Sequence, residues 1–439
     1  MEQEFTCWAL LPLRSRLKRS GIMRRPFRIP WTALALTKEK EMNFKRNGSG
    51  MKAGLNACCL AIFSLAYAPF VFAQAPPVPP GGTVIASGLE GPRGMTFGPD
   101  GLLYFAEAGL GGTQAVPKGC QGVPAPVGPN HGGLTARISR IESNGERTTV
   151  VAGLPSGLTS LPTGDTNGAA DVAFVDGQLY ALTAGGGCSH GNPNFPNAVL
   201  RINVKRHSFE MVANLSRFFQ DHPVAHPNVA DFEPDGVPYN MKAFHGDLIV
   251  IEPNHGRLLR INLTGRQEPR IEQLSDLSAP LGHIVPTSVA NLDDRFFVGN
   301  LGTFPVVVGS SKLYQVTHNG FVIDYWGGFT TIIDVQKDSQ GRLYVMELSS
   351  AAGFPNIGQG RIIRIANGVA EEIVSGLNVP TAMALDCHDD IYVSDLGAAT
   401  GSAGRILRFT NPISGQSLTT IEVRKPAPLD REDGADDDN

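Results

Sequence analysis

The sequence predicts an all-β fold, a six-bladed β-propeller with four-stranded blades, and two observations carry this prediction. Glycine and proline occur 51 and 32 times in 439 residues, as expected where many short strands are joined by tight turns. A short strand pattern, usually a basic or polar residue, two mostly apolar ones, Arg or Gln and another apolar one, recurs along the chain. Units repeated in this way stack on their neighbours, because none can bury its apolar faces alone. The copies lie at residues 136–141, 198–202, 256–261, 311–316, 360–365 and 404–409.

Each repeat is expected to supply four strands in a fixed order. The first begins at a small or polar residue followed by an aliphatic one, as in Asp171-Val172, and leads into a Gly- and Asp-rich turn. The second alternates aromatic and aliphatic residues with period two, which is typical of a strand packed between sheets. The third is the recurrent pattern, and the fourth is represented by residues 150–154 and 373–377.

The last repeat has no obvious fourth strand. Residues 83–89, which precede the first repeat, match the fourth strands at 150–154 and 373–377. We expect this N-terminal strand to complete the sixth sheet and close the ring, which leaves no exposed sheet edge at the junction. Residues 418–423 are the alternative, because they could supply the missing strand locally.

Segments that flank the repeats are expected to lie outside the propeller. A charged start, a short apolar core and a small-residue cleavage site predict a secretory signal peptide, so the mature protein is expected to be secreted or periplasmic. Met42 is as good a start for this signal as Met51. The predicted divisions are 1–50, an upstream extension that is not native or is disordered; 51–73, the signal peptide; 74–82, a proline-rich linker; 83–412, the propeller; and 413–439, an acidic C-terminal tail.

Composition and motifs argue against several classes of function. The net charge of -4 does not favour nucleic acid as a partner, and no stretch resembles a transmembrane anchor of the mature chain. The sequence has no Gly-x-Ser-x-Gly elbow, no glycine-rich phosphate loop after a strand and no Cys-x-x-Cys pair. Nucleophilic and nucleotide-dependent chemistry therefore lack support, and no catalytic residue is predicted.

Extra chain is concentrated in the first two repeats. It falls between the second and third strands, at 109–133 and 185–197, and between blades, at 155–169 and 216–238. These two kinds of connection emerge on the same face of a propeller, and insertions on one face usually mark the binding face. We therefore expect a small molecule or a protein of unknown identity to bind this long-loop face.

Two cysteines fall in the long loops of neighbouring repeats. Cys120 and Cys188 could form a disulfide, because export would place the chain in an oxidising compartment. The alternative is that the cysteines of the exported chain remain unpaired thiols.

Polar side chains from all six repeats are expected to converge at the mouth of the central channel, where a concave ligand site would form. Carboxylate and amide oxygens suit hard cations, so a divalent cation, calcium above all, is the cofactor to expect. Arg93 is the cation that could instead hold an anionic group. The ligand-binding candidates are Arg93, Asp171, Asn240, Thr287, Asp334 and Thr381. The metal-ligand candidates are Asp171, Asn240, Asp334, Glu107 and Glu252.

A structural role is the competing interpretation for the residues that end the second strands. Acidic and amide side chains at strand ends commonly accept N–H bonds from the next loop and so satisfy buried donors. The residues to which this applies are Glu107, Glu252, Asn300, Glu347 and Asp395. Histidines of the upper loops, including His190 and two Pro-Asn-His-Gly turns at 129–132 and 253–256, lack the spacing of a zinc or copper site.

Four segments occur in an order typical of one family. They are GLEGPRGMTFGPDG at 88–101, VPTSV at 285–289, FTTIIDV at 329–335 and VPTAM at 379–383. With them the chain resembles, over residues 83–409, the ScyD/ScyE family of exported propellers, which is related to NHL-type and gluconolactonase-type propellers. The resemblance implies an exported six-bladed propeller. One departure is NGAAD at 167–171, where a Pro-His-Asp-like segment is usual, and it puts in doubt any chemistry by a histidine beside Asp171.

Two functions remain open, and the sequence does not decide whether the protein is an enzyme. The first is a binding or scaffold protein of the ScyD/ScyE type that uses its long-loop face. The alternative is a metal-assisted lactone or ester hydrolase of the gluconolactonase type. That activity would need a cation held among Asp171, Asn240 and Asp334, with a further carboxylate as base.

Overall fold

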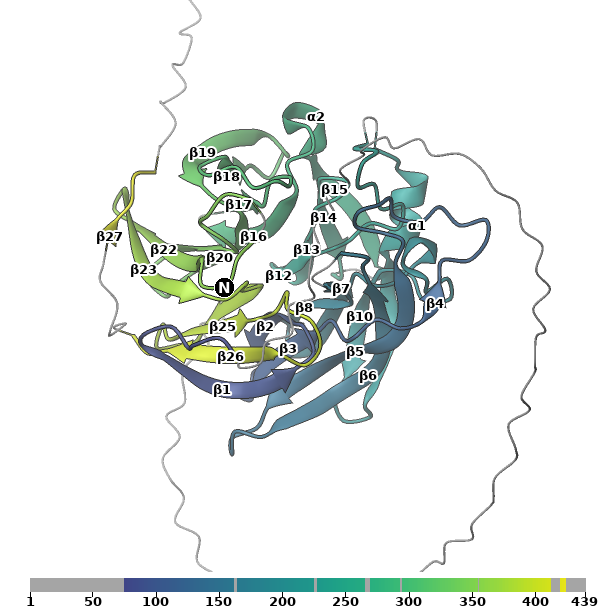
Figure 1. The fold of residues 1–439 in the computed structure, drawn as a ribbon, viewed down its shortest axis with the longest axis horizontal. Helices are drawn as coiled ribbons and strands as arrows, with labels where there is room; N and C mark the ends of the chain where they lie inside the picture. Colours follow the sequence, from purple (N-terminus) through teal and green to yellow (C-terminus); the bar gives the residue numbers. More distant parts are fainter. Residues whose placement is uncertain are drawn as a thin grey trace, which may run out of the picture. The chain divides into compact units, whose positions relative to one another are not determined.

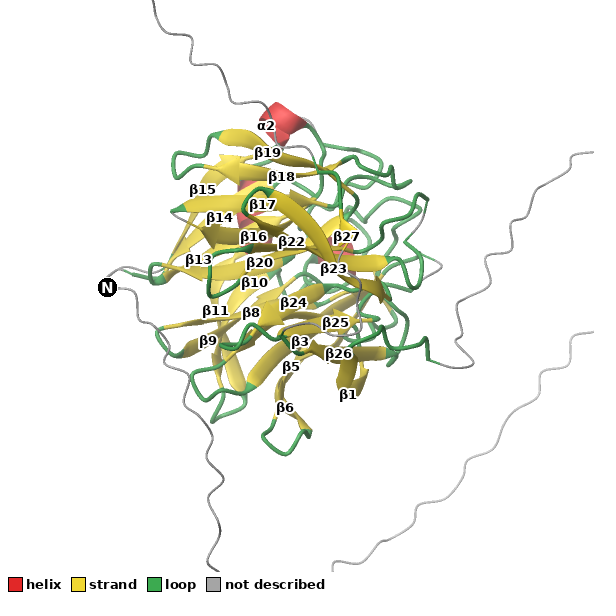
Figure 2. Ribbon diagram, turned by 90° about the vertical axis from the view of Figure 1, so that its left-hand side faces the viewer, coloured by secondary structure: helices red, strands yellow, loops and turns green. Residues whose placement is uncertain are grey.

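Six antiparallel sheets, arranged around a central axis as the blades of a β-propeller, make up the described part of the chain (Figure 1). This computed structural model describes residues 75–161, 164–224, 227–264, 269–292, 294–353, 355–411 and 419–423. Seen from the side, strands dominate the fold and the helices are short (Figure 2). The predicted fold class is confirmed.

The first three blades follow the chain, each with its inner strand first and its outer strand last. Their strands are β2 (Pro92–Phe97), β3 (Leu103–Glu107), β5 (His131–Ile141) and β6 (Arg147–Leu158) in blade 1; β8 (Ala169–Val175), β9 (Gln178–Thr183), β10 (Ala198–Asn203) and β11 (Ser208–Asn214) in blade 2; and β12 (Asn240–Phe244), β13 (Asp247–Glu252), β14 (Arg257–Asn262) and β15 (Arg270–Asp276) in blade 3. Their connections contain β4 (Gln114–Ala115), β7 (Thr166–Asn167), η1 (Cys188–His190) and α1 (Leu215–Asp221).

The next blades repeat this order with shorter connections. Their strands are β16 (Pro286–Leu292), β17 (Arg295–Asn300), β18 (Ser311–Val316) and β19 (Val322–Phe329) in blade 4; β20 (Ile332–Lys337), β21 (Leu343–Glu347), β22 (Gly360–Ala366) and β23 (Val369–Leu377) in blade 5; and β24 (Ala382–Leu385), β25 (Ile391–Asp395) and β26 (Gly404–Phe409) in blade 6. The short helix α2 (Ser278–Leu281) precedes blade 4.

Blade 6 takes its outer strand from the N-terminal side of the fold. Strand β1 (Gly82–Leu89) pairs antiparallel with β26, with Thr83 opposite Arg408. The alternative strand at 418–423 does not complete this sheet. Thr419–Thr420 form β27, which pairs instead with β23 and adds a fifth strand to blade 5, while residue 418 lies outside the described residues.

Six apolar clusters hold the blades together, one at each junction between neighbours. Successive residues of a second strand serve opposite junctions, because side chains alternate across a sheet. Tyr104 belongs to the cluster between blades 1 and 2, whereas Phe105 belongs to the cluster between blades 6 and 1. Both faces of every blade are thus buried, and this burial explains why the repeat carries apolar residues at consecutive positions.

The segments that flank the propeller depart in part from the predicted divisions. The expected extension and signal peptide fall within residues 1–74, which lie outside the described residues. The expected linker is built into the fold, since Arg405 donates to the carbonyl oxygens of Pro76 and Pro77 at 2.8 and 3.0 Å. Of the expected acidic tail, Ile421 and Val423 pack against the cluster between blades 4 and 5. Within the described ranges, no helix has the length and apolar character needed to cross a membrane.

Candidate functional site

The predicted ligand-binding residues lie at the starts of the inner strands, one in each blade, and all are buried. Five of these side chains form a hydrogen bond with main chain at the start of the next blade around the ring, whereas Arg93 donates to the Thr166 carbonyl oxygen in the connection that follows blade 1. We call this set of six side chains the inter-blade belt. It consists of Arg93, Asp171, Asn240, Thr287, Asp334 and Thr381.

Five members of the belt use short polar side chains. Three of them accept the N–H of the aliphatic residue at the start of the next inner strand, and the two threonines donate to a carbonyl oxygen. The accepting pairs are Asp171 with Met241 at 2.7 Å, Asn240 with Val289 at 3.1 Å and Asp334 with Met383 at 2.8 Å. The donating pairs are Thr287 with Ile332 and Thr381 with Pro92, both at 2.6 Å.

Arg93, the predicted anion-binding residue, already has a carboxylate partner. Its guanidinium group contacts Asp165 Oδ1 at 2.7 Å and donates to the carbonyl oxygens of Thr166, at 2.8 Å, and of Gly397. Burial lowers the pKa of Arg93, but the Asp165 carboxylate outweighs that effect and holds the pKa above its ordinary value. The charge of Arg93 is therefore balanced within the fold.

Tyr239 joins opposite blades near the belt. It immediately precedes the inner strand of blade 3, and its hydroxyl donates to the carbonyl oxygen of Thr381 in blade 6 at 2.9 Å. Blades 3 and 6 face each other across a ring of six, so this side chain spans the axis. Burial raises the pKa of Tyr239 well above its ordinary value, which keeps the phenol neutral and able to donate. The Tyr239 side chain therefore bridges the region where the concave ligand site at the mouth of the channel was expected.

The belt does not provide a free set of oxygen ligands. Burial raises the pKa of Asp171 to about 7, and Lys242 and the N–H of Met241 offset this only in part. Both of its oxygens accept hydrogen bonds, from Val172 N–H at 2.8 Å and from Met241 N–H and the Asn240 amide. Oxygens that already accept N–H donors do not match the donor set that calcium requires, so the residues present do not fit a bound calcium ion.

The remaining metal candidates lie apart and support loops. Glu107 accepts the N–H of Glu90 at 3.0 Å, and Glu252 accepts the N–H of Val237 at 2.8 Å. The equivalent residues Glu347 and Asp395 accept N–H groups in the same place in blades 5 and 6. These carboxylates therefore accept main-chain N–H groups at strand ends, as the structural role considered for them requires. Among the residues that the structure describes, no group of three or more His, Cys, Asp or Glu side chains is placed to hold a metal ion.

The long connections of blades 1, 2 and 3 contact one another, as expected of insertions on one face. We call the described residues of 108–134, 155–168, 184–197 and 215–239 the long-loop platform. A disulfide joins Cys120 in blade 1 to Cys188 in blade 2, with the Cα atoms 5.7 Å apart. Beside it, the Asn192 amide donates to the carbonyl oxygens of Ser156 and Gly185 at 3.0 and 2.7 Å. These links tie three of the four connections together.

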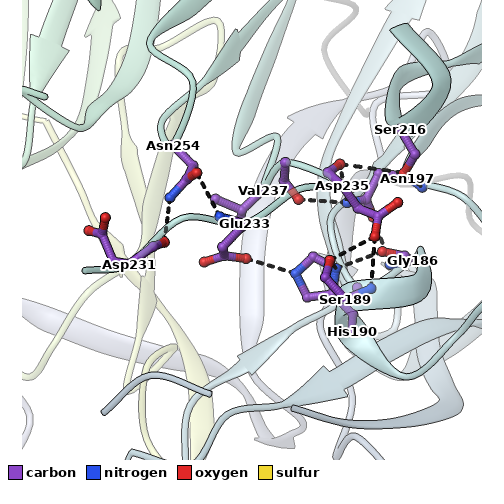
Figure 3. A network of polar contacts seen from close by, with 12 residues as sticks. Gly186, Ser189, His190, Asn197, Ser216, Asp231, Glu233, Asp235, Val237 and Asn254 are labelled. Carbon is purple, nitrogen blue, oxygen red and sulfur yellow. Dashed lines mark hydrogen bonds and ion pairs between the residues drawn. The ribbon is translucent and has the colours of Figure 1, made fainter. Parts of the chain in front are cut away.

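A buried histidine links the platform to its fourth connection (Figure 3). His190 has no exposed surface, and its Nε2 lies 2.7 Å from the Glu233 carboxylate while its Nδ1 lies 2.6 Å from the Gly186 carbonyl oxygen. Two acceptors favour a ring with two N–H donors. Burial lowers the pKa of His190, but Glu233 and the Gly186 carbonyl outweigh it, so the pKa is raised.

Acid and amide side chains surround this ion pair on both sides. Ser189 donates to Asp235 Oδ2 from its hydroxyl at 2.7 Å and from its N–H at 2.8 Å. The Asn197 amide donates to the carbonyl oxygens of Asp235 and Gly236. The Asn254 side chain accepts the Glu233 N–H at 2.9 Å and donates to the Asp231 carbonyl oxygen at 2.8 Å (Figure 3).

Serine, histidine and acid side chains meet in the platform without forming a catalytic relay. Ser189 Oγ lies 3.4 Å from His190 Nδ1, but that nitrogen faces the Gly186 carbonyl oxygen and the serine hydroxyl donates to Asp235. A nucleophilic serine needs a ring nitrogen free to take its proton. The arrangement therefore holds loops in place and does not activate a nucleophile.

The sequence marks some of the residues around His190 as candidates, but it does not indicate which residues contact each other. His190 and the turn containing Asn254 were visible as polar residues in upper loops, whereas Glu233 and Asp235 were not singled out. The alternation of acid with Pro and Gly in Glu233-Pro-Asp235-Gly marks a turn, and it is the one signal that could have directed attention there. Their partners lie over 40 residues away, with separations of 43 and 46 residues.

No family model and no curated protein matches the chain. Solved structures similar to it include gluconolactonases. A gluconolactonase from Xanthomonas campestris is 10% identical, covers 77% of this chain and 99% of its own, and gives a TM-score of 0.40. The PQQ-bound aldose sugar dehydrogenase of Streptomyces coelicolor is 13% identical over 79% and 100%, with a TM-score of 0.44. A chain of a nidogen/laminin complex is 12% identical over 67% and 92%, with a TM-score of 0.43. At these identities the likeness concerns the fold and not the chemistry of any site.

Proposed function

We propose that this propeller is a non-catalytic binding or scaffold protein that presents its long-loop platform to a partner outside the cytoplasm. The observation that carries the proposal is the way the platform is built. A disulfide, a buried ion pair and buried amide bonds fix four connections that meet in one place. Ordered loops on a rigid scaffold are the usual means by which a propeller binds a partner.

The blades themselves do not require this platform. Blades 4, 5 and 6 are built on the same four antiparallel strands without connections as long as those at 108–130 and 215–239. The additional chain in blades 1 and 2, and in the connection to blade 3, therefore serves something other than closing the sheets. Several of its polar side chains, such as His190 and Asn197, are buried, and exposed apolar side chains such as Leu110 and Leu134 remain for contact.

The hydrolase alternative is less well supported. It would need Asp171, Asn240 and Asp334 to hold a cation, and their side-chain oxygens accept main-chain and amide N–H donors instead. We also propose that the protein is exported and belongs to the ScyD/ScyE family, because its sequence resembles that family. A disulfide in the platform agrees with export, since disulfides form in oxidising compartments.

Site-directed photo-crosslinking tests the proposal. A crosslinking amino acid is placed at Leu110 or Leu134 on the platform. As a comparison it is placed at Phe321 or Val369, which are exposed at or next to turns at the other ends of the strands. Incubation with the extracytoplasmic fraction of the producing cells should yield a discrete adduct from the platform positions only. The same adducts from both pairs of positions, or none from either pair, would contradict the proposal.

A further inference from the structure

An extended proline-rich segment docks against this propeller in the structure itself. Residues 75–80 read Ala-Pro-Pro-Val-Pro-Pro, and Pro76 and Pro79 are buried while the residues between them are exposed. Burial at every third residue is the period of a polyproline II helix. The segment is held through its carbonyl oxygens, by Arg405 and by the Asn378 amide, which donates to Pro77 at 3.3 Å.

Pro79 lies over a glycine at a bulge of an outer strand. A Cβ atom on Gly376 would meet Pro79 Cβ at 3.9 Å. In β23 the register passes from Leu377 to Ser375, so Gly376 has no partner in the ladder, and its φ is 80°. Glycine in a strand often marks a place where another backbone approaches closely. Here the approaching backbone is the proline-rich segment.

The outer strands of blades 1, 4 and 6 have the same glycine bulge, and in blade 4 it lies beside an open groove. In β19 the register passes from Phe329 to Gly327, so Gly328 is left without a ladder partner, with φ 96°. The groove has a volume of about 560 Å³, within the range of ligand pockets. The residues that line it include Val308, Lys312, Asp324, Trp326, Gly327 and Gly328.

The groove wall contains a donor without an acceptor. Trp326 is 4% exposed, and its indole Nε1–H is buried with no hydrogen-bond partner in the described part of the chain. A buried indole N–H usually finds an acceptor, and one left unpaired costs about 1–3 kcal/mol. Lys312 supplies further donors, since its ammonium group has three N–H bonds and Asp324 takes one. It occupies in blade 4 the position of the strand pattern that Arg405 occupies in blade 6. In the groove the cation and the glycine bulge belong to one blade, whereas Arg405 and Gly376 belong to neighbouring blades.

From these features we propose that the blade 4 groove binds a proline-rich extended segment of another chain. Its carbonyl oxygens accept from Lys312 and from the Trp326 indole, whose ring turns to bring the buried Nε1–H to the groove. Its backbone lies over Gly327 and Gly328, and a proline ring packs on Val308. Polyproline II segments suit such a groove because they form no internal hydrogen bonds, so all their carbonyl oxygens are free. Their fixed backbone also loses little entropy on binding.

The test uses the chain's own docking sequence as the ligand. The full chain is titrated with a synthetic Ala-Pro-Pro-Val-Pro-Pro peptide and, as a control, with Ala-Gly-Gly-Val-Gly-Gly, by calorimetry and by tryptophan emission. Trp326 is the only tryptophan between residues 75 and 423, so the emission change should vanish in Trp326→Phe. The proline peptide should saturate its site, and the glycine peptide should bind at least about tenfold more weakly because its backbone is not preformed.

Two variants locate the site. Trp326→Phe removes the N–H but keeps an aromatic ring, and Lys312→Met removes the ammonium from a residue on the surface; each should weaken the peptide about fivefold or more, as one lost hydrogen bond implies. Lys205→Met, at an exposed lysine in blade 2, is the matched control and should change nothing. No binding up to millimolar peptide, or equal affinity in wild type, Trp326→Phe and Lys312→Met, would overturn the inference. The groove is independent of the platform, so crosslinking at Leu110 and Leu134 can fail while this test succeeds.

Discussion

The inter-blade belt and the long-loop platform are both built from buried polar side chains, but they differ in their construction. The belt repeats one kind of contact around the ring, between a side chain at the start of an inner strand and the main chain of the next. The platform uses contacts that occur once each, such as His190 with Glu233. Contacts that repeat from blade to blade therefore hold the propeller together. Contacts that occur only once build the surface formed by the long loops.

Removing the disulfide should have the largest effect on this comparison. Replacing Cys120 and Cys188 with serine frees two segments separated by 68 residues, which by the chain-entropy relation lowers the free energy of unfolding by about 4 kcal/mol. Urea unfolding followed by circular dichroism measures the loss. Reducing the wild type should reproduce it, and a double variant as stable as the oxidised wild type would show that the platform does not depend on this link.

Breaking the ion pair of the platform should come next. Glu233→Gln leaves the fully buried His190 ring without a counter-charge, at a cost of about 3 kcal/mol. His190→Asn in the same background tests the coupling, because the two changes together should cost less than their sum. Strict additivity in a double-mutant cycle would argue against the pair.

The same pair predicts a dependence on pH. The raised pKa of His190 means that its contribution to stability is complete below the unfolded value of 6.5 and is lost as pH rises through the folded pKa. The free energy of unfolding should therefore decline over that interval in the wild type and decline less in Glu233→Gln. Unfolding curves at several pH values measure it, and an identical slope in both proteins would contradict the assignment.

A single belt residue should matter less, at about 2 kcal/mol. Asp334→Ala leaves the buried N–H groups of Val335 and Met383 without their acceptor. Asp334→Asn keeps an acceptor oxygen and is the matched control, with a smaller expected loss. Equal stability of the Ala variant and the wild type would mean that the ring does not depend on this contact.

The sequence predicts the inter-blade belt much better than it predicts the long-loop platform. The repeat located all six belt residues, because a position that recurs in every blade is visible in one sequence, but it could not reveal that main-chain donors already occupy their side chains. Platform contacts leave no periodic signal. The two Pro-Asn-His-Gly turns illustrate the limit. Asn254 clamps the Glu233 loop, whereas Asn130 is fully buried and its amide finds no hydrogen-bond partner among the described residues.

Calcium should have the smallest effect on stability, namely none. A cation held at a hundred times its dissociation constant stabilises a fold by about 2.7 kcal/mol, which a thermal-shift assay detects easily. Because the oxygens of Asp171 and Asp334 accept N–H donors, millimolar calcium, manganese or zinc should leave the melting temperature unchanged. A clear rise would restore the belt as a metal site and the hydrolase as the better function.

The pairing of β1 with β26 sets an order of events while the protein is being made. The first strand of the fold leaves the ribosome before any blade is complete, yet its partner follows only after the other five blades. Until then Leu89 cannot join its apolar cluster, and unpaired strand edges stay open to wrong partners. Deleting β26 should therefore lower the stability of the propeller more than its six residues suggest, because β1 loses its partner and blade 6 loses a strand at the same time.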